Sequence, residues 1–124
     1  MNIKEYKKLL KKSESRSKYG NKKITFRGET FDSKKEYEYY LYLLDREKKG
    51  EISQLKRQYT YTIQPSFYMP DGSKISDISY KADFVYYDLI DSRIHIVDVK
   101  GFKTDVYKLK KKLLAYRGIY IEEV

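Results

Sequence analysis

Two acidic residues and a lysine stand out because apolar residues surround them. The run Ile94–Lys100 has the composition of a strand, yet it carries Asp98 and Lys100 two positions apart. Side chains alternate between the two faces of a strand, so these two share a face. Asp83 lies within a second such segment, residues 80–87. Burying an ionised carboxylate costs on the order of several kcal/mol unless a counter-ion, hydrogen bonds or a metal offset it.

The spacing of the two segments predicts that their carboxylates lie together. A turn centred near residues 90 and 91 pairs the segments as antiparallel strands and sets Asp83 opposite Asp98. The Cβ atoms of facing residues are about 4.5–5.5 Å apart. Two carboxylates at that separation repel each other, and one stays protonated unless a cation lies between them. For Asp98 and Lys100 alone, an ion pair at the end of an edge strand is the alternative interpretation.

This constellation is suited to one kind of chemistry. Magnesium prefers oxygen ligands and is commonly held by one or two carboxylates together with phosphate oxygens. A water bound to such a cation is a better nucleophile, and a coordinated phosphodiester is more electrophilic. Lys100 can orient that water or stabilise the charge that develops at phosphorus. The residues therefore indicate metal-dependent phosphodiester hydrolysis.

The elements that must position these residues can be read from the apolar pattern. A helix is predicted from Ser33 to about Lys49, with Gly50 as its stop, and Glu36 completes a capping-box pattern with Ser33. Glu36 has a second interpretation, in which it points over the sheet toward Asp98, but the pattern alone favours the cap. The apolar stripe expected to be buried comprises Tyr37, Tyr40, Leu41 and Leu44.

The remaining elements complete an α/β fold. Residues 24–31 suggest a small hairpin, residues 52–67 a long alternating strand, and residues 69–72 a turn before a returning strand over 74–87. A second helix is predicted to begin at Thr104 or Asp105 and to bury Val106, Leu109, Leu113 and Tyr116. Residues 119–121 then form a last strand, parallel to its neighbour through a right-handed crossover. The predicted order is α-β-β-β-α-β, with a mixed sheet and a helix on each face.

Composition limits the partners and the compartment. The 124 residues contain no cysteine, carry a formal charge of +9 and have a pI near 9.5. We expect one domain over residues 23–124, preceded by a basic helix and arm over residues 1–22. The charge favours polyanions, nucleic acid before an anionic membrane. No apolar run reaches the length of a membrane span, so a cytoplasmic protein is expected.

The ordered set of Asp83, Asp98–Lys100 and Glu36 on this frame resembles the PD-(D/E)XK nuclease superfamily. Three segments are similar to small endonuclease-like proteins of phages and prophages in that superfamily: Lys18–Lys23, Phe31–Glu36 and Val97–Thr104. The resemblance covers nearly the whole chain, although its short D-x-K motif is weak alone. It departs from the pattern at Ala82, where the motif has proline.

The resemblance implies a role for each site residue. Asp83 and Asp98 would bind Mg²⁺ or Mn²⁺ together with the backbone carbonyl of Val99, and Lys100 would be the catalytic lysine. Glu36 would complete the metal site from the helix, which replaces the interpretation of Glu36 as a cap alone. The resemblance also associates a glutamine with such sites, and Gln58 is the weaker candidate here, with an ordinary amide on the sheet surface as its alternative.

The basic residues offer candidates for DNA contact. Lys34, Lys35 and Lys103 are expected near the metal, and Lys108 and Lys111 belong to a basic band on the second helix that is otherwise a solvated face. His95 is the only histidine, so a histidine-based site is not expected, and alternation sets its side chain opposite Asp98. The ring should have its own partners in the strand.

The expected function is a Mg²⁺- or Mn²⁺-dependent DNA endonuclease. A chain this small has few elements for reading bases, so the enzyme should recognise the structure of its DNA, with branched DNA such as Holliday junctions as the first choice. By analogy within the superfamily, it would act as a homodimer in phage recombination or replication inside a bacterial host. The alternatives are a sequence-specific or nicking nuclease of this fold, and a non-catalytic DNA- or protein-binding accessory module.

Overall fold

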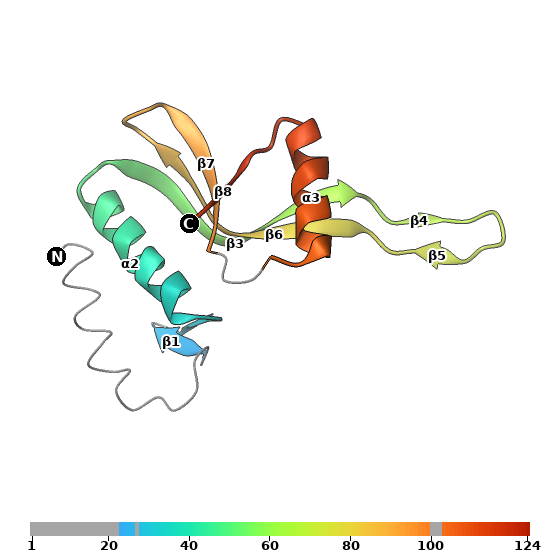
Figure 1. The fold of residues 1–124 in the computed structure, drawn as a ribbon, viewed down its shortest axis with the longest axis horizontal. Coiled ribbons are helices and arrows are strands. Elements are labelled where there is room, and N and C mark those ends of the chain that lie inside the picture. The colour runs from blue at the N-terminus through green and yellow to red at the C-terminus, as the bar shows by residue number, and fades with distance from the viewer. Residues whose placement is uncertain (1–22, 27, 100–102) are drawn as a thin grey trace. The chain divides into compact units, whose positions relative to one another are not determined.

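The computed structural model describes residues 23–26, 28–99 and 103–124 (Figure 1). The N-terminal arm and Lys100 lie outside the described residues. The elements in chain order are β1 (Ile24–Phe26), β2 (Glu29–Phe31), α2 (Lys34–Lys48), β3 (Ile52–Gln64), β4 (Phe67–Tyr68), β5 (Lys74–Ile75), β6 (Ile78–Asp88), β7 (Arg93–Asp98), α3 (Asp105–Tyr116) and β8 (Ile121–Glu123). Neither described helix has the length and apolar character needed to span a membrane.

The main sheet is mixed and has four strands in the order β3-β6-β7-β8. Strands β7 and β8 are parallel, as predicted for strands joined through a helix, and they pair Ile96 with Ile121 and Asp98 with Glu123. Two short ribbons lie outside this sheet: β1 with β2, and β4 with β5. In Figure 1 the β4–β5 ribbon continues from β3 and β6 beyond α3. The α/β class and the order of the main elements agree with the sequence-based prediction.

The chain divides into two compact units, and each is described by itself. The first contains the described residues up to Leu55 together with Tyr87–Arg93. The second contains Lys56–Tyr86 and Ile94–Val124.

In the first unit, α2 begins as predicted but buries different residues. The Ser33 hydroxyl accepts a hydrogen bond from the Glu36 amide, and the helix ends before Gly50, whose φ is +76°. Leu41 and Leu43 are buried, and Leu43 was not expected. The predicted stripe was wrong for Tyr37, Tyr40 and Leu44, which are half-buried. The tyrosine rings pack on Phe31 at centroid distances of 5.3 and 5.2 Å, an arrangement in which rings pack while their hydroxyls stay close to water.

Strand β3 departs from the strict alternation that its sequence suggests. Gln54 and Gln58 have positive φ values of 55° and 53°. A left-handed residue inside a strand is typical of a β-bulge, which redirects the side chains that follow it. The burial pattern of β3 is interrupted around Gln58, where two half-buried residues are followed by two exposed ones.

In the second unit, α3 packs through a face that the sequence analysis did not select. Thr104 caps the helix through a hydrogen bond from the Tyr107 amide, in agreement with prediction. The buried residues are Tyr107 and Leu114, seven positions apart. The predicted stripe was wrong, because all four of its residues are exposed: Val106, Leu109, Leu113 and Tyr116. Both faces of α3 contain apolar residues. The face that is buried is the one with Tyr107, whose hydroxyl donates a hydrogen bond to Glu123.

Strand β8 starts two residues later than predicted. The Ile119 amide donates to the Leu114 carbonyl at 3.0 Å, next to Gly118 with a φ of +83°. Residue 119 therefore still belongs to the C-terminal cap of α3 and is not available for sheet pairing. The shift places Glu123 in the last strand, in register with Asp98.

The core of the second unit is formed by α3 and by strands β3, β6, β7 and β8, and the face of β7 and β8 that contributes to it carries Ile96 and Ile121. Its members are Ile63, Tyr80, Ala82, Val85, Ile96, Tyr107, Leu114 and Ile121. Because side chains alternate along a strand, Asp98 follows Ile96 and Glu123 follows Ile121 on this same face. Two acidic residues thus continue an apolar face that a helix covers.

Candidate active site

Asp98 ends β7 as a completely buried carboxylate, with 0% of its surface exposed. Its backbone carbonyl accepts a hydrogen bond from the Val124 amide at 3.0 Å, which holds this end of β7 against the residue that follows β8. An ionised group at this depth is unfavourable unless polar groups or a cation compensate its charge. Asp98 is therefore the residue on which this site is centred.

Asp83 is held at the end of β7 by hydrogen bonds to both of its oxygens. The Val99 amide donates to Oδ2 at 2.9 Å, and the Gln58 side-chain amide donates to Oδ1 at 3.2 Å. The first bond agrees with the predicted pairing of this part of β6 with β7. The second brings Gln58, the weakest of the sequence-based candidates, directly to Asp83. The backbone of Gln58 has the left-handed conformation that is typical of a β-bulge, with a φ of 53°.

Tyr107 of α3 links the acidic residues of this face. It is 7% exposed, and its hydroxyl donates to Glu123 Oε2 at 2.9 Å. Burial raises the pKa of Tyr107 far above its ordinary value, and the hydrogen bond to Glu123 and the charges of Asp98 and Asp83 raise it further. The carboxylates of Asp83, Asp98 and Glu123 therefore all lie near one phenol.

Glu123 connects this group to two lysines. Lys111 Nζ lies 2.9 Å and Lys103 Nζ 3.3 Å from Glu123 Oε1. Hydrogen bonds from Lys111 and Tyr107 are the main reason why the pKa of Glu123 falls to about 2. Glu123 therefore stays ionised at all ordinary pH values, on the strand position beside Asp98.

Residues 16–123 match the protein family described as "Protein of unknown function (DUF1064)". The chain belongs to this DUF1064 family. Searches of curated proteins and of solved structures give no match. Membership in DUF1064 thus groups the chain with relatives but attaches no activity to the residues of the site.

Glu36, the predicted helical ligand, belongs to the other unit of this DUF1064 chain. It is 3% exposed, and its Oε2 accepts a hydrogen bond from the Asp32 amide at 3.3 Å. Its own amide donates to the Ser33 hydroxyl at 3.1 Å. Ser33 therefore caps the helix as the sequence pattern suggested, but the Glu36 carboxylate bonds the amide of the residue before the cap and not that of Ser33 itself. The hydrogen bonds of Glu36 therefore show its capping role, and its role as a ligand stays a prediction.

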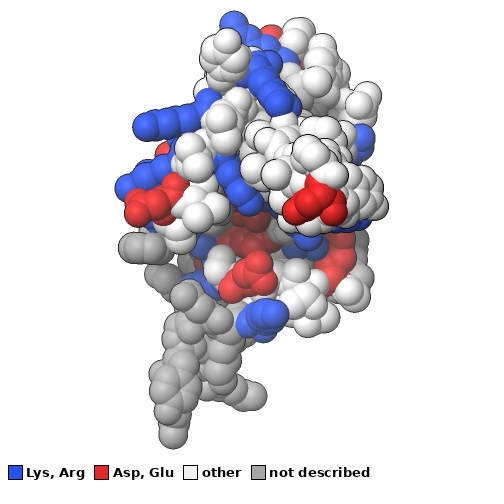
Figure 2. All heavy atoms as spheres, turned by 90° about the vertical axis from the view of Figure 1, so that its right-hand side faces the viewer, with Lys and Arg blue, Asp and Glu red and all other residues white. Residues whose placement is uncertain are grey.

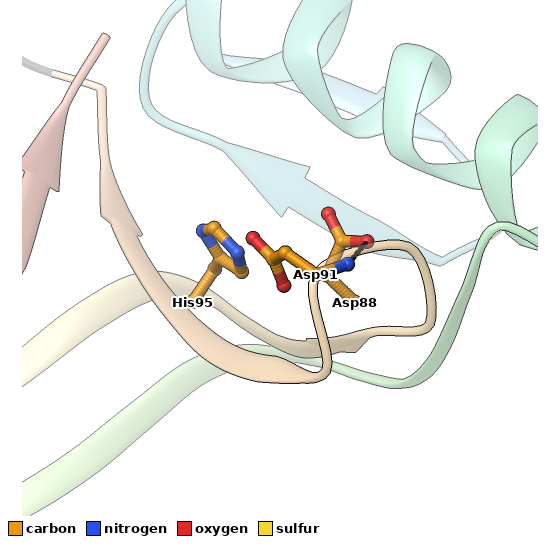
Figure 3. A group of neighbouring side chains, drawn as sticks. All are labelled: Asp88, Asp91 and His95. Atoms are coloured by element: carbon orange, nitrogen blue, oxygen red, sulfur yellow. Dashed lines mark hydrogen bonds between the residues drawn. The ribbon is translucent and has the colours of Figure 1, made fainter.

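Three further potential metal ligands, Asp88, Asp91 and His95, lie around the turn that joins β6 to β7 (Figure 3). Asp88 Oδ1 accepts from the Ile90 amide at 2.8 Å and from the Asp91 amide at 3.4 Å. Asp91 Oδ1 accepts from the Arg93 amide at 3.0 Å. These are the hydrogen bonds of a turn, so they account for both carboxylates without a bound ion.

His95 has partners of its own, as expected. Its Nδ1 is hydrogen-bonded to Glu122, and its ring stacks on Tyr86 with a centroid distance of 5.3 Å and an interplanar angle of 7°. Its strand position places it on the sheet face opposite Asp98.

The predicted DNA-contacting lysines of the DUF1064 chain have different surroundings. Lys34 is paired with Glu38 at 3.4 Å, whereas Lys35 and Lys108 are exposed. Lys103 and Lys111 are the two that reach the acidic group, through Glu123. Figure 2 shows Lys and Arg side chains spread over one face of the molecule with Asp and Glu side chains between them.

Sequence reasoning missed Glu123 and Tyr107. The expected strand ended at residue 121, so Glu123 fell outside every predicted element. Tyr107 was overlooked because the stripe of Val106, Leu109 and Leu113 gave a more regular pattern on α3. The available signal was the pairing of Ile121 and Glu123 at alternate positions, which repeats that of Ile96 and Asp98.

Proposed function

We propose that this chain is a DNA endonuclease that hydrolyses phosphodiester bonds with Mg²⁺ or Mn²⁺ held by Asp83 and Asp98. The observation that carries the proposal is that Asp83 Oδ2 accepts a hydrogen bond at 2.9 Å from the amide of Val99, the residue directly after the fully buried Asp98. Carboxylate oxygens are the ligands that these hard cations prefer, so the donor set fits the ion. A cation there would also compensate the repulsion between the two negative charges.

The proposed architecture is the restriction-endonuclease-like core of the PD-(D/E)XK superfamily. The order α2, β3, β6, β7, α3, β8 supports this, because it matches the expected α-β-β-β-α-β order once the β1–β2 and β4–β5 ribbons are set aside. In that architecture the acidic pair comes from the second and third strands of the core, which here are β6 and β7.

Each residue has a defined task in this proposal. A bound ion supplies a more acidic water and a polarised phosphodiester. Asp83 and Asp98 hold the ion, with the Val99 carbonyl as a further ligand, and Gln58 fixes the orientation of Asp83 through its hydrogen bond. Lys100 would orient the attacking water, and Glu36 would complete the metal site from α2.

The proposed substrate is branched DNA, such as a Holliday junction. The formal charge of +9 supports binding to a polyanion, and phosphate contacts position a duplex without reading its sequence. Lys34, Lys35, Lys103, Lys108 and Lys111 are the proposed phosphate contacts. We further propose that the protein acts as a homodimer in the cytoplasm of a bacterial host, in phage recombination or replication.

Cleavage assays on three DNA substrates test this function. The full chain is incubated with linear duplex, single-stranded and four-way DNA, each with Mg²⁺, with Mn²⁺ and with EDTA. We expect metal-dependent cutting that is fastest on the four-way substrate. Cutting at a consensus sequence of linear duplex would favour the sequence-specific alternative. Salt-sensitive DNA binding with no cutting in either metal would contradict the nuclease and favour an accessory module.

A further inference from the structure

Tyr107 and Glu123 form a hydrogen-bonded pair where α3 meets the end of the sheet. The hydroxyl-to-carboxylate distance is 2.9 Å, and the ring of Tyr107 lies within the buried core of the second unit. A hydrogen bond between a neutral donor and a charged acceptor is stronger than one between neutral groups. The pair therefore joins α3 to β8 at a defined point.

That point lies next to the residue on which the proposed chemistry depends. Glu123 is the register partner of Asp98, and the residue after it, Val124, donates its amide to the Asp98 carbonyl at 3.0 Å. A shift of Glu123 would therefore move the backbone that carries Asp98. Tyr107 also lies close enough to Asp98 and Asp83 for their charges to act on it.

Glu123 in turn holds a lysine beside the acidic group. Lys111 lies one helical turn after Tyr107 on α3, and both donate to the same carboxylate, at 2.9 Å each. Residues four apart on a helix are neighbours on one face. One carboxylate thus fixes two side chains of α3.

We infer that Tyr107 and Glu123 are positioning residues that hold Asp98 in its ion-binding geometry from the neighbouring strand and helix. This inference rests on the proposed function and extends it to two residues outside the D-x-K motif. Groups that orient metal ligands without touching the ion typically change metal affinity about 10- to 100-fold when they are removed. Replacing either residue removes the same hydrogen bond, so Tyr107 and Glu123 are expected to act as one unit.

Tyr80 and Glu122 provide matched controls. The Tyr80 ring lies 6.1 Å from that of Tyr107 in the same core, and within the described residues its buried hydroxyl has no hydrogen-bond partner. Glu122 precedes Glu123 in β8 but is exposed and bonds His95. Tyr80→Phe removes a hydroxyl from a buried ring, as Tyr107→Phe does. Glu122→Gln removes the negative charge of a strand carboxylate, as Glu123→Gln does.

The test measures Mn²⁺ affinity by calorimetry on the full chain, far below the melting temperature of every variant. We expect Tyr107→Phe and Glu123→Gln each to raise the Kd about 10-fold or more, and the double variant to be no worse than the weaker-binding single variant. Tyr80→Phe and Glu122→Gln should keep the wild-type Kd.

The outcomes separate this inference from the proposed function. Wild-type Kd values in Tyr107→Phe and Glu123→Gln, with binding lost in Asp98→Asn, would overturn the positioning role and leave the metal site intact. A lowered melting temperature in these variants with an unchanged Kd would also overturn the positioning role, because it would show that the two residues contribute to stability alone. If the wild type itself binds no Mn²⁺, the proposed function fails and this inference fails with it.

Discussion

The buried and half-buried carboxylates of the two units have different surroundings. In the first unit the three buried carboxylates each have a separate partner nearby in the sequence: Glu36 accepts from the Asp32 amide, Asp45 pairs with Lys49 at 2.9 Å, and Asp88 accepts from the Ile90 amide at 2.8 Å. In the second unit Asp83, Asp98 and Glu123 all lie near one tyrosine. Local pairing stabilises helix ends and turns. Gathering like charges opposes folding, and such arrangements concentrate at functional sites.

The largest effect is expected from Asp98→Asn, which keeps the shape of the side chain and removes its charge. We expect DNA cleavage to fall by on the order of 10³-fold or more, because a ligand of the proposed ion is lost. The melting temperature should stay the same or rise, since repulsion from Asp83 and Glu123 is relieved. Cleavage rates and thermal unfolding of the same preparation measure both quantities. A large loss of stability would show that Asp98 is a structural residue, like the carboxylates of the first unit.

Glu36→Gln tests whether Glu36 is a metal ligand in addition to its role in the cap of α2. Gln keeps an oxygen that can accept from the Asp32 amide, so the helix cap and the melting temperature should change little. If Glu36 is also a ligand, cleavage should fall by on the order of 10²-fold, because an amide is a poorer ligand for Mg²⁺. Glu38→Gln on the same helix is the control. Wild-type cleavage by Glu36→Gln would limit Glu36 to its capping role.

Asp88→Asn is the counterpart of Asp98→Asn in the first unit. Although burial acts in the opposite direction, the Ile90 amide and the Arg46 guanidinium hold the pKa of Asp88 below its ordinary value. Loss of this buried charge partner should cost about 1–3 kcal/mol and lower the melting temperature by roughly 3–10 °C. Cleavage measured below the transition should remain at the wild-type rate. Unchanged stability together with lost cleavage would contradict this, because it would give Asp88 a catalytic role and not a structural one.

The smallest effect concerns the pH dependence of stability. The pKa of Glu123 is lowered from 4.5 to about 2 in the folded protein, so its contribution to stability is complete above about pH 4.5 and is lost as the pH falls toward 2. Glu123→Gln should therefore be less stable than wild type above pH 4.5, and the difference in melting temperature should shrink as the pH is lowered. Thermal unfolding at several pH values measures it. A difference that does not depend on pH would mean that the charge of Glu123 has no part in folding.

The sequence was sufficient for those parts of the fold that local pattern determines. The Ser33 and Thr104 caps, the turn at residues 69–72 and the closeness of Asp83 to the end of β7 followed from capping, turn chemistry and alternation. The buried face of α3 did not, because two apolar faces compete and tertiary contacts of Tyr107 decide between them. The later start of β8 depends on the helix cap at Ile119, and with it the position of Glu123.

The central claim is that the carboxylates of the second unit, and not those of the turn in the first, bind a divalent cation. A Mn²⁺ titration followed by electron paramagnetic resonance on wild type, Asp83→Asn and Asp91→Asn tests this directly. We predict that wild type and Asp91→Asn bind the ion with the same affinity and that Asp83→Asn loses binding. Binding that survives in Asp83→Asn and disappears in Asp91→Asn would contradict the account.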